Sequence, residues 1–156
     1  MNVQSHAQIV KPGDFAIGDL NYLAEKPRSC VAVVIEPNHE DIPVKGLLHF
    51  NGKEATLQNF IEQVKSRIPG GIAKLAGAGS YLSTSRNNLE AVLSALNQSG
   101  IPIASIDVGG HYERSVVAGS NGTFSIQKEY NPFFPTRTGI LAGYEGLEER
   151  AETVRL

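Results

Sequence analysis

The sequence predicts an α+β fold in which helices pack on one side of a mixed sheet. Segments with the apolar runs or alternation typical of strands outnumber the two segments with helical periodicity. Strands and helices also fail to alternate regularly, as they would in a parallel α/β fold. A Ser120-Asn121-Gly122 turn between two alternating segments indicates a hairpin, which adds antiparallel pairing to the sheet.

The strands are predicted from apolar runs bounded by turn residues. The clearest, residues 30–35, is mostly β-branched and apolar on both faces, as expected of a covered central strand. Residues 44–50 form the next strand. Residues 21–28 are expected to be a loop, because Pro27 disfavours regular structure in the residue before it. The remaining expected strands are residues 14–20, 72–78, 101–107, 115–118 and 123–127.

Two segments have the spacing of amphipathic helices. The first covers residues 56–68, and a Pro-Gly-Gly sequence ends it. In the second, Asn87 is expected to cap the helix, with Glu90 at the capping-box position and Gly100 as the stop. The buried stripe of the first helix is expected to be Leu57, Phe60, Ile61, Val64 and Ile68.

Composition and charge exclude several classes of partner. The 156 residues suit one domain with its own core. Because 14 lysines and arginines face 16 aspartates and glutamates, the net charge of −2 does not attract nucleic acid or anionic lipid. No stretch reaches the roughly 20 apolar residues that cross a bilayer, and no secretory signal is evident. We therefore expect a cytoplasmic protein with no nucleic-acid partner and no membrane insertion, which a single cysteine fits.

Cys30 and His49 are the candidate reactive residues. They stand at the start of one buried strand and near the end of the next, so neighbouring strands could bring a thiol and an imidazole together. A histidine, or a positive charge such as Arg28, activates a thiol by lowering its pKa. The structural alternative stays open, because a lone cysteine is usually a small buried apolar residue and a histidine at a strand end usually has a structural role.

Other motifs favour structure over chemistry. The histidines and the cysteine lack metal-ligand spacing, so no metal site is expected. Residues 77–79 lack the rest of a dinucleotide or phosphate loop and are interpreted as a tight turn that another group approaches closely. Asp107 has no acidic partner for glycosidase-like chemistry. Phe133 and Phe134 are expected to cover an edge of the core, with a partner surface as the alternative.

Seven short blocks form a recognisable series: residues 29–33 (SCVAV), 46–49 (GLLH), 73–78 (AKLAGA), 86–92 (RNNLEAV), 100–103 (GIPI), 107–110 (DVGG) and 114–116 (RSV). Each block alone is weak evidence. In this order and spacing, from about Ile9 to Glu129, they resemble the CheD family of chemoreceptor glutamine deamidases. The resemblance implies a three-layer α/β/β fold with two main helices on one side, a deamidase domain over residues 13–130, and no cofactor.

The resemblance also implies a site and a reaction. Cys30 would be the nucleophile and His49 the general base and acid in hydrolysis of a protein glutamine carboxamide to glutamate and ammonia. The implied partners are a protein substrate with an exposed glutamine, such as a chemoreceptor, and a chemotaxis phosphatase. Ser29, Ser80 and Asn87 are further candidates for supporting the pair.

The sequence departs from the family pattern upstream of Cys30. Ala24 stands where the family has the threonine that completes a triad, and a backbone carbonyl is the candidate substitute. A non-catalytic or weakly catalytic module that docks a receptor or a phosphatase is therefore the alternative function. Residues 1–12 are expected to form a flexible arm, and residues 131–156 an extension with helical character beyond the resemblance.

Overall fold

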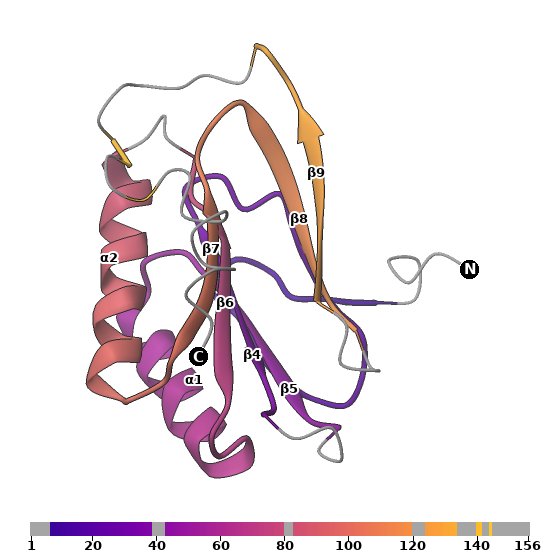
Figure 1. The fold of residues 1–156 in the computed structure, drawn as a ribbon, viewed down its shortest axis with the longest axis vertical. Coiled ribbons are helices and arrows are strands. Elements are labelled where there is room, and N and C mark those ends of the chain that lie inside the picture. The colour runs from indigo at the N-terminus through magenta and orange to yellow at the C-terminus, as the bar shows by residue number, and fades with distance from the viewer. Residues whose placement is uncertain are drawn as a thin grey trace.

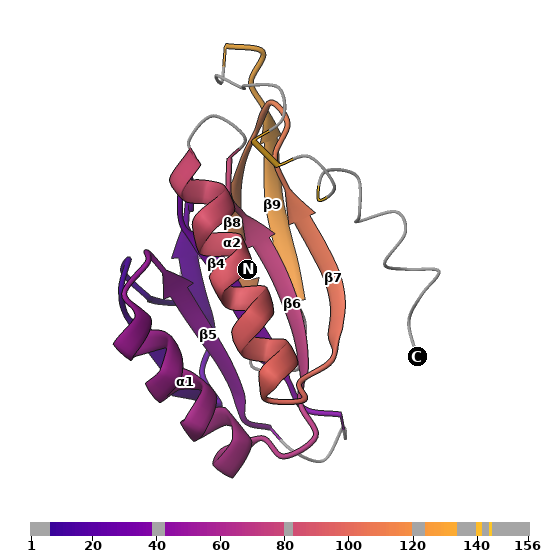
Figure 2. The same cartoon turned by 90° about the vertical axis from the view of Figure 1, so that its left-hand side faces the viewer.

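Two helices, a five-stranded sheet and a four-stranded sheet form three layers (Figure 1). This computed structural model describes residues 7–38, 43–79, 83–119, 124–133, 140–141 and 144. The helices are α1 (Glu54–Arg67) and α2 (Ser83–Gln98), which cover the outer face of the five-stranded sheet (Figure 2). The predicted α+β class, with mixed sheets and helices on one side, is confirmed.

The central sheet has the order β2-β5-β4-β6-β7. Only β6 and β7 pair in parallel; the other neighbours are antiparallel. Pro102 precedes an edge strand, where its missing N–H is tolerated. The strands are β2 (Phe15–Gly18), β4 (Val31–Glu36), β5 (Lys45–Phe50), β6 (Ile72–Gly77) and β7 (Ile103–Val108).

The second sheet has the order β1-β3-β8-β9. Its strands are β1 (Gln8–Ile9), β3 (Tyr22–Glu25), β8 (Tyr112–Ala118) and β9 (Phe124–Tyr130). The antiparallel β8–β9 pair agrees with the predicted hairpin, although residues 120–123 lie outside the described part of the chain.

Apolar alternation along β4 explains how the layers are joined. Val31, Val33 and Ile35 pack with the helices, whereas Ala32 and Val34 face the second sheet. The small Ala32, Ala76 and Ala24 belong to the layer between the sheets. As a result β4 is buried on both faces, as its uninterrupted apolar sequence predicted.

Two expectations need correction, and the structure adds detail at both ends of the chain. Residues 22–25 form β3 and not a loop, because β8 supplies a partner strand and Pro27 lies beyond the paired residues. Helix α2 already contains Ser83, so Asn87 is an exposed residue within it and not its cap. In the expected N-terminal arm, residues 8–9 form β1 and Val10 is buried. In the C-terminal extension, Leu141 joins the core, while residues 145–156, part of the segment expected to have helical character, lie outside the described residues.

Candidate functional site

Cys30 lies immediately before β4 and is half-buried. The Ala78 amide donates a 2.9 Å hydrogen bond to the Cys30 carbonyl, which continues the β4–β6 pairing by one step. Gly77 allows this approach, because a Cβ atom there would lie 2.9 Å from the Cys30 carbonyl oxygen. Gly77 also has a φ of 109°, which glycine adopts without strain. The close approach predicted at residues 77–79 is thus made by the cysteine loop itself.

Helix α2 holds the two residues before Cys30. The Asn88 side-chain amide donates a 2.9 Å hydrogen bond to the Ser29 carbonyl, and the Ser85 hydroxyl donates one of 3.5 Å to the Arg28 carbonyl. The two side chains are three residues apart, so they lie on the same face of the helix. Sequence reasoning missed both residues and proposed the neighbouring Asn87 instead. Ser80, the other proposed support, lies outside the described residues.

We expect Asn88→Ala to lower the free energy of unfolding by about 1 kcal/mol, because the Ser29 carbonyl loses its donor. Asn87→Ala is the matched control and should change it by less than about 0.5 kcal/mol, since Asn87 is exposed. Both changes give the same gain in helix propensity, so their difference reports the hydrogen bond. Urea unfolding measures the difference in unfolding free energy between the two variants. Equal stabilities would mean that Asn88 does not hold the loop before Cys30.

His49 lies on β5 with only 2% of its surface exposed. Its Nδ1 is 3.0 Å from the Val10 carbonyl oxygen. A carbonyl only accepts hydrogen bonds, so this contact requires the proton on Nδ1 and leaves Nε2 unprotonated in the neutral ring. The backbone of the same segment is also paired: Gly13 N–H donates to the His49 carbonyl at 2.8 Å, and His49 N–H to the Asp14 carbonyl at 3.0 Å. Residues 10–14 therefore fix both the backbone and the ring of His49.

Alternation along β4, extended by one residue beyond its start at Val31, puts Cys30 on the same side of the sheet as His49. His49 pairs with Ala32, which faces the second sheet, and Cys30 lies two residues before Ala32. Such diagonal neighbours lie about 7–8 Å apart across an antiparallel pair. Among the described residues, the His49 ring bonds to the Val10 carbonyl, and no hydrogen bond joins it to the Cys30 thiol.

The pKa shifts of Cys30 and His49 both favour the neutral form of the side chain. Burial raises the pKa of the Cys30 thiol above its ordinary value, and a hydrogen bond from the Ser29 side chain opposes this in part. Burial lowers the pKa of His49, while its bond to the Val10 carbonyl opposes the shift. Arg28, proposed as a positive neighbour of the thiol, forms a 2.9 Å ion pair with Glu113 on β8. The two shifts therefore favour a thiol and a neutral imidazole over a thiolate–imidazolium pair in the resting site.

We expect the folded protein to react with iodoacetamide more slowly at pH 7 than the urea-unfolded chain, because only the thiolate reacts and its fraction is lower when the pKa is raised. The alkylation rate should rise with pH and reach its midpoint above that of the unfolded chain. Mass spectrometry of the single cysteine follows the reaction. A folded-state midpoint below the unfolded one would instead mean a preformed thiolate.

Ala24 lies on β3, fully buried between the sheets and opposite Val116. Its methyl group cannot orient an imidazole by hydrogen bonding.

Asp107, the carboxylate without an acidic partner, accepts hydrogen bonds at one oxygen from Arg114 and Lys128 on the second sheet. This cluster joins β7 to β8 and β9.

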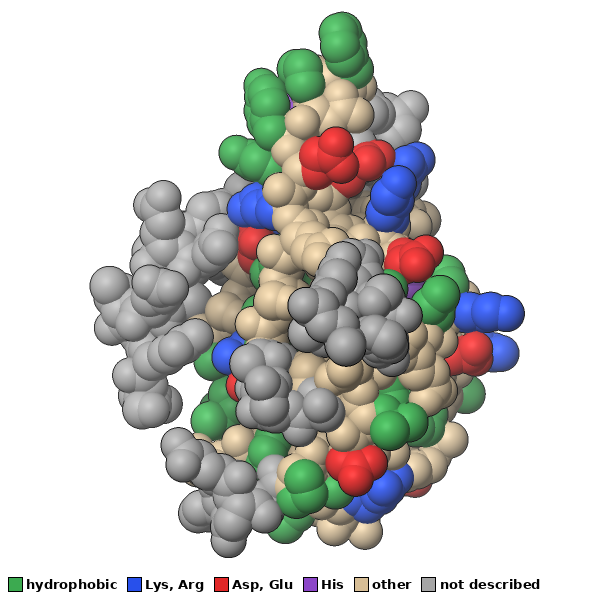
Figure 3. All heavy atoms as spheres, turned by 90° about the vertical axis from the view of Figure 1, so that its right-hand side faces the viewer, with side chains coloured by type: hydrophobic (Ala, Val, Ile, Leu, Met, Phe, Trp, Pro, Cys, Tyr) green, Lys and Arg blue, Asp and Glu red, His purple; other side chains and the backbone are tan. Residues whose placement is uncertain are grey.

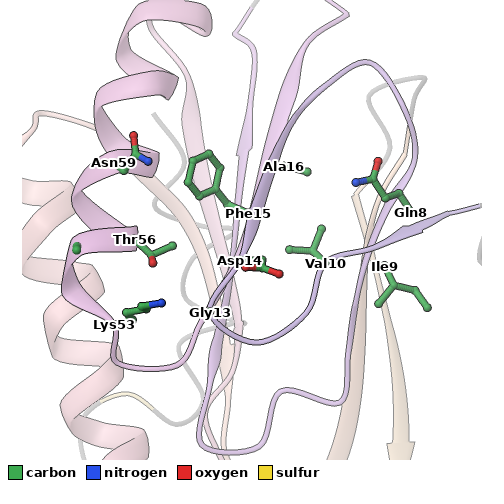
Figure 4. A pocket seen from close by; sticks show the side chains of 11 residues that line it. Gln8, Ile9, Val10, Gly13, Asp14, Phe15, Ala16, Lys53, Thr56 and Asn59 are labelled. Carbon is green, nitrogen blue, oxygen red and sulfur yellow. The ribbon is translucent and has the colours of Figure 1, made fainter.

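A surface hollow of about 450 Å³ lies between the N-terminal segment and the start of α1 (Figure 4). Neither Cys30 nor His49 lines it, so volume alone does not identify the candidate site. Val10, whose carbonyl bonds to His49, is one of the residues that line it. The other lining residues are Gln8, Ile9, Gly13, Asp14, Phe15, Ala16, Lys53, Ala55, Thr56 and Asn59.

The described residues show two features that bear on the expected metal and membrane partners. They contain no group of three or more histidine, cysteine or acidic residues arranged to hold a metal ion. Within the same ranges, neither helix is long and apolar enough to cross a membrane.

Comparison with known proteins gives a family match over part of the chain. The family model described as CheD chemotactic sensory transduction matches residues 55–128. The match contains α2, β6, β7 and β8, but it begins after Cys30 and His49 and so assigns no role to either. No curated protein matches the chain. The family match over residues 55–128 agrees with the resemblance to the CheD family predicted from the seven sequence blocks.

Proposed function

We propose that this protein is a protein-glutamine deamidase that converts glutamine side chains of a protein substrate to glutamate with release of ammonia. CheD-family proteins are generally glutamine deamidases. The observation that carries the proposal is the buried His49 ring, whose Nδ1 is held by the Val10 carbonyl. That bond leaves the basic Nε2 for the cysteine on the same face of the sheet.

In the proposed mechanism, His49 Nε2 takes the Cys30 proton as Sγ attacks the carboxamide carbon. The backbone N–H of Cys30 is the candidate donor to the oxyanion, and no acceptor for it occurs among the loop hydrogen bonds of the described residues. The imidazolium then protonates the departing nitrogen, which leaves as ammonia and gives a thioester. Next, His49 takes a proton from water; the hydroxide attacks the thioester, and the sulfur leaves with that proton.

Neutral Cys30 and His49 side chains fit a mechanism in which the proton moves as the thiol attacks a bound substrate. They do not fit a thiolate–imidazolium ion pair that forms before the substrate binds. A raised thiol pKa and a lowered imidazole pKa both oppose charge separation before the substrate excludes water. Because the Val10 carbonyl holds the His49 ring, a side-chain rotation of Cys30 must bring Sγ within hydrogen-bonding distance of Nε2.

The same observations support a second candidate, a CheD-fold module that binds a receptor or a chemotaxis phosphatase without turnover. The absence of a Cys30–His49 hydrogen bond favours it. We propose a cytoplasmic location for either function, because the family description is chemotactic sensory transduction.

One assay separates the two candidates. The protein is incubated with the cytoplasmic fragment of a chemoreceptor, and the fragment is analysed for the gain of about 1 Da that accompanies conversion of a carboxamide to a carboxylate. A gain at specific glutamines supports the deamidase. Binding of the fragment without any gain would support the non-catalytic module.

Ala24→Thr introduces the threonine of the family pattern. It tests whether the Val10 carbonyl already orients the His49 ring in place of that threonine. We expect no increase in deamidation rate, because Nδ1 of His49 is already bonded. We expect a loss of about 1–3 kcal/mol in unfolding free energy, since Ala24 is fully buried and has little space around it. Deamidation kinetics and urea unfolding measure both effects. A rate increase of about tenfold or more would show that His49 lacks an adequate partner in the native chain.

A further inference from the structure

Four aromatic side chains form an exposed cluster where β8 begins and β9 ends; we call His111, Tyr112, Tyr130 and Phe133 the aromatic tip. Tyr130 is 61% exposed and Phe133 is 91% exposed. Hydrophobic side chains gather at this narrow end of the molecule (Figure 3). Large exposed aromatic groups are costly to leave in water and are typical of binding surfaces.

The aromatic tip is built with defined geometry. The Tyr130 ring packs edge-on against Tyr112, with centroids 5.6 Å apart, and against His111 at 6.4 Å. Asn131 N–H donates a 2.8 Å hydrogen bond to the His111 carbonyl, and the Asn131 side chain accepts one of 3.0 Å from Phe133 N–H. These two bonds hold the backbone of the turn at Phe133, which reduces the backbone entropy that a partner must remove on binding.

The aromatic tip is continuous with the approach to Cys30. Glu113, next to Tyr112, forms its 2.9 Å ion pair with Arg28, two residues before the cysteine. On the other side, Gly109 N–H donates to the Ala78 carbonyl at 3.2 Å, and Ala78 N–H donates to the Cys30 carbonyl at 2.9 Å. A protein that places a side chain at Cys30 would therefore meet the aromatic tip along the same edge.

We propose that the aromatic tip is the docking surface for the protein substrate and receives an apolar side chain close to the target glutamine. This inference rests on the proposed function, because it takes Cys30 as the point that the glutamine must reach. The charges beside the tip are paired within the chain, Arg28 with Glu113 and Lys128 with Asp107, so the contact offered is mainly apolar. The family match ends at residue 128, so Tyr130 and Phe133 are features of this chain outside the matched region.

The test measures binding and not catalysis. A labelled chemoreceptor cytoplasmic fragment is titrated with Cys30→Ala protein, and with the same protein carrying Tyr130→Ala and Phe133→Ala together. We expect the double change to weaken binding by about tenfold or more, because aromatic anchors dominate such contacts. Leu20→Ala is the matched control: Leu20 is also exposed, at 57%, but follows β2 at the opposite end of the sheets. Its effect should be less than about twofold.

Two further measurements test whether the weaker binding comes from the aromatic tip itself and not from a change at Cys30 or in folding. In chains that retain Cys30, the double change should leave iodoacetamide alkylation within about twofold, since a small reagent needs no docking surface. Phe133→Ala alone should weaken binding with no change in melting temperature, because its side chain is almost fully exposed.

Each other outcome overturns the docking proposal. The first such outcome is unchanged affinity in the double variant, and the second is no binding of the fragment by the parent chain. The third is a parent dimer that the double change dissociates, because this would make a second copy of the chain the partner of the aromatic tip. Binding through the tip without any deamidation would leave the docking proposal intact and refute the proposed activity.

Discussion

Replacement of Cys30 by alanine is expected to lower deamidation of a receptor fragment by at least about a thousandfold, because no other group can form the thioester. His49→Gln should have a similar effect, since glutamine cannot take the thiol proton. The double variant should be no slower than either single one, because the two residues act in the same step. Mass analysis of the fragment over time measures all three rates.

Binding provides the control for this result. Cys30→Ala should bind the fragment as the parent does, which shows that the surface is intact. Deamidation by Cys30→Ala at the parental rate would refute the nucleophile assignment. Loss of activity in Cys30→Ala but not in His49→Gln would leave Cys30 as nucleophile and require another base.

The second large effect is expected at Asp107, where Asp107→Ala should lower the free energy of unfolding by about 3–5 kcal/mol. The Asp107 and Arg114 side chains are only 5% and 4% exposed, and Arg114 donates to one carboxylate oxygen at 2.9 and 3.2 Å. Removal of the carboxylate leaves a buried guanidinium without its counter-charge. Lys128, which also binds Asp107 at 3.0 Å, would lose this ion pair.

Urea unfolding of Asp107→Ala measures this effect, with Glu90→Ala as its control. Glu90 pairs with Arg86 on the surface of α2, where the side chains are 49% and 37% exposed, so its removal should cost less than about 1 kcal/mol. Similar losses in the two variants would mean that the buried cluster contributes no more than a surface ion pair.

The parts of the fold that sequence reasoning predicted are those that local patterns determine. The apolar run of β4 and the helical spacing of Leu57, Phe60 and Ile61 each indicate burial without knowledge of a partner. Strand β3 was missed because its stability depends on pairing with β8, about 90 residues later, and no local signal reports that pairing. The start of α2 was placed late because its first turn is polar and precedes the apolar stripe.

In the candidate site, too, the sequence predicted some residues, whereas others could be found only from the fold. The order of sequence blocks indicated Cys30 and His49, whose roles remain predictions. The sequence could suggest that a backbone carbonyl holds His49, but not that it is the carbonyl of Val10. Every residue has a carbonyl, and only the fold decides which one lies next to the imidazole. Asn87 and Asn88 differ by one position in the same helix, so the chain alone could not decide which one reaches the Ser29 carbonyl.

The central claim is that the Val10 carbonyl holds His49 as a neutral base with its proton on Nδ1. Nitrogen NMR of histidine-labelled protein, assigned with His49→Gln, tests it directly through the tautomer and the titration midpoint. We predict a protonated Nδ1, an unprotonated Nε2 at neutral pH, and a pKa below the ordinary value of 6.5, because burial disfavours the charged ring. A ring protonated on Nε2, or a pKa above 6.5, would contradict the account.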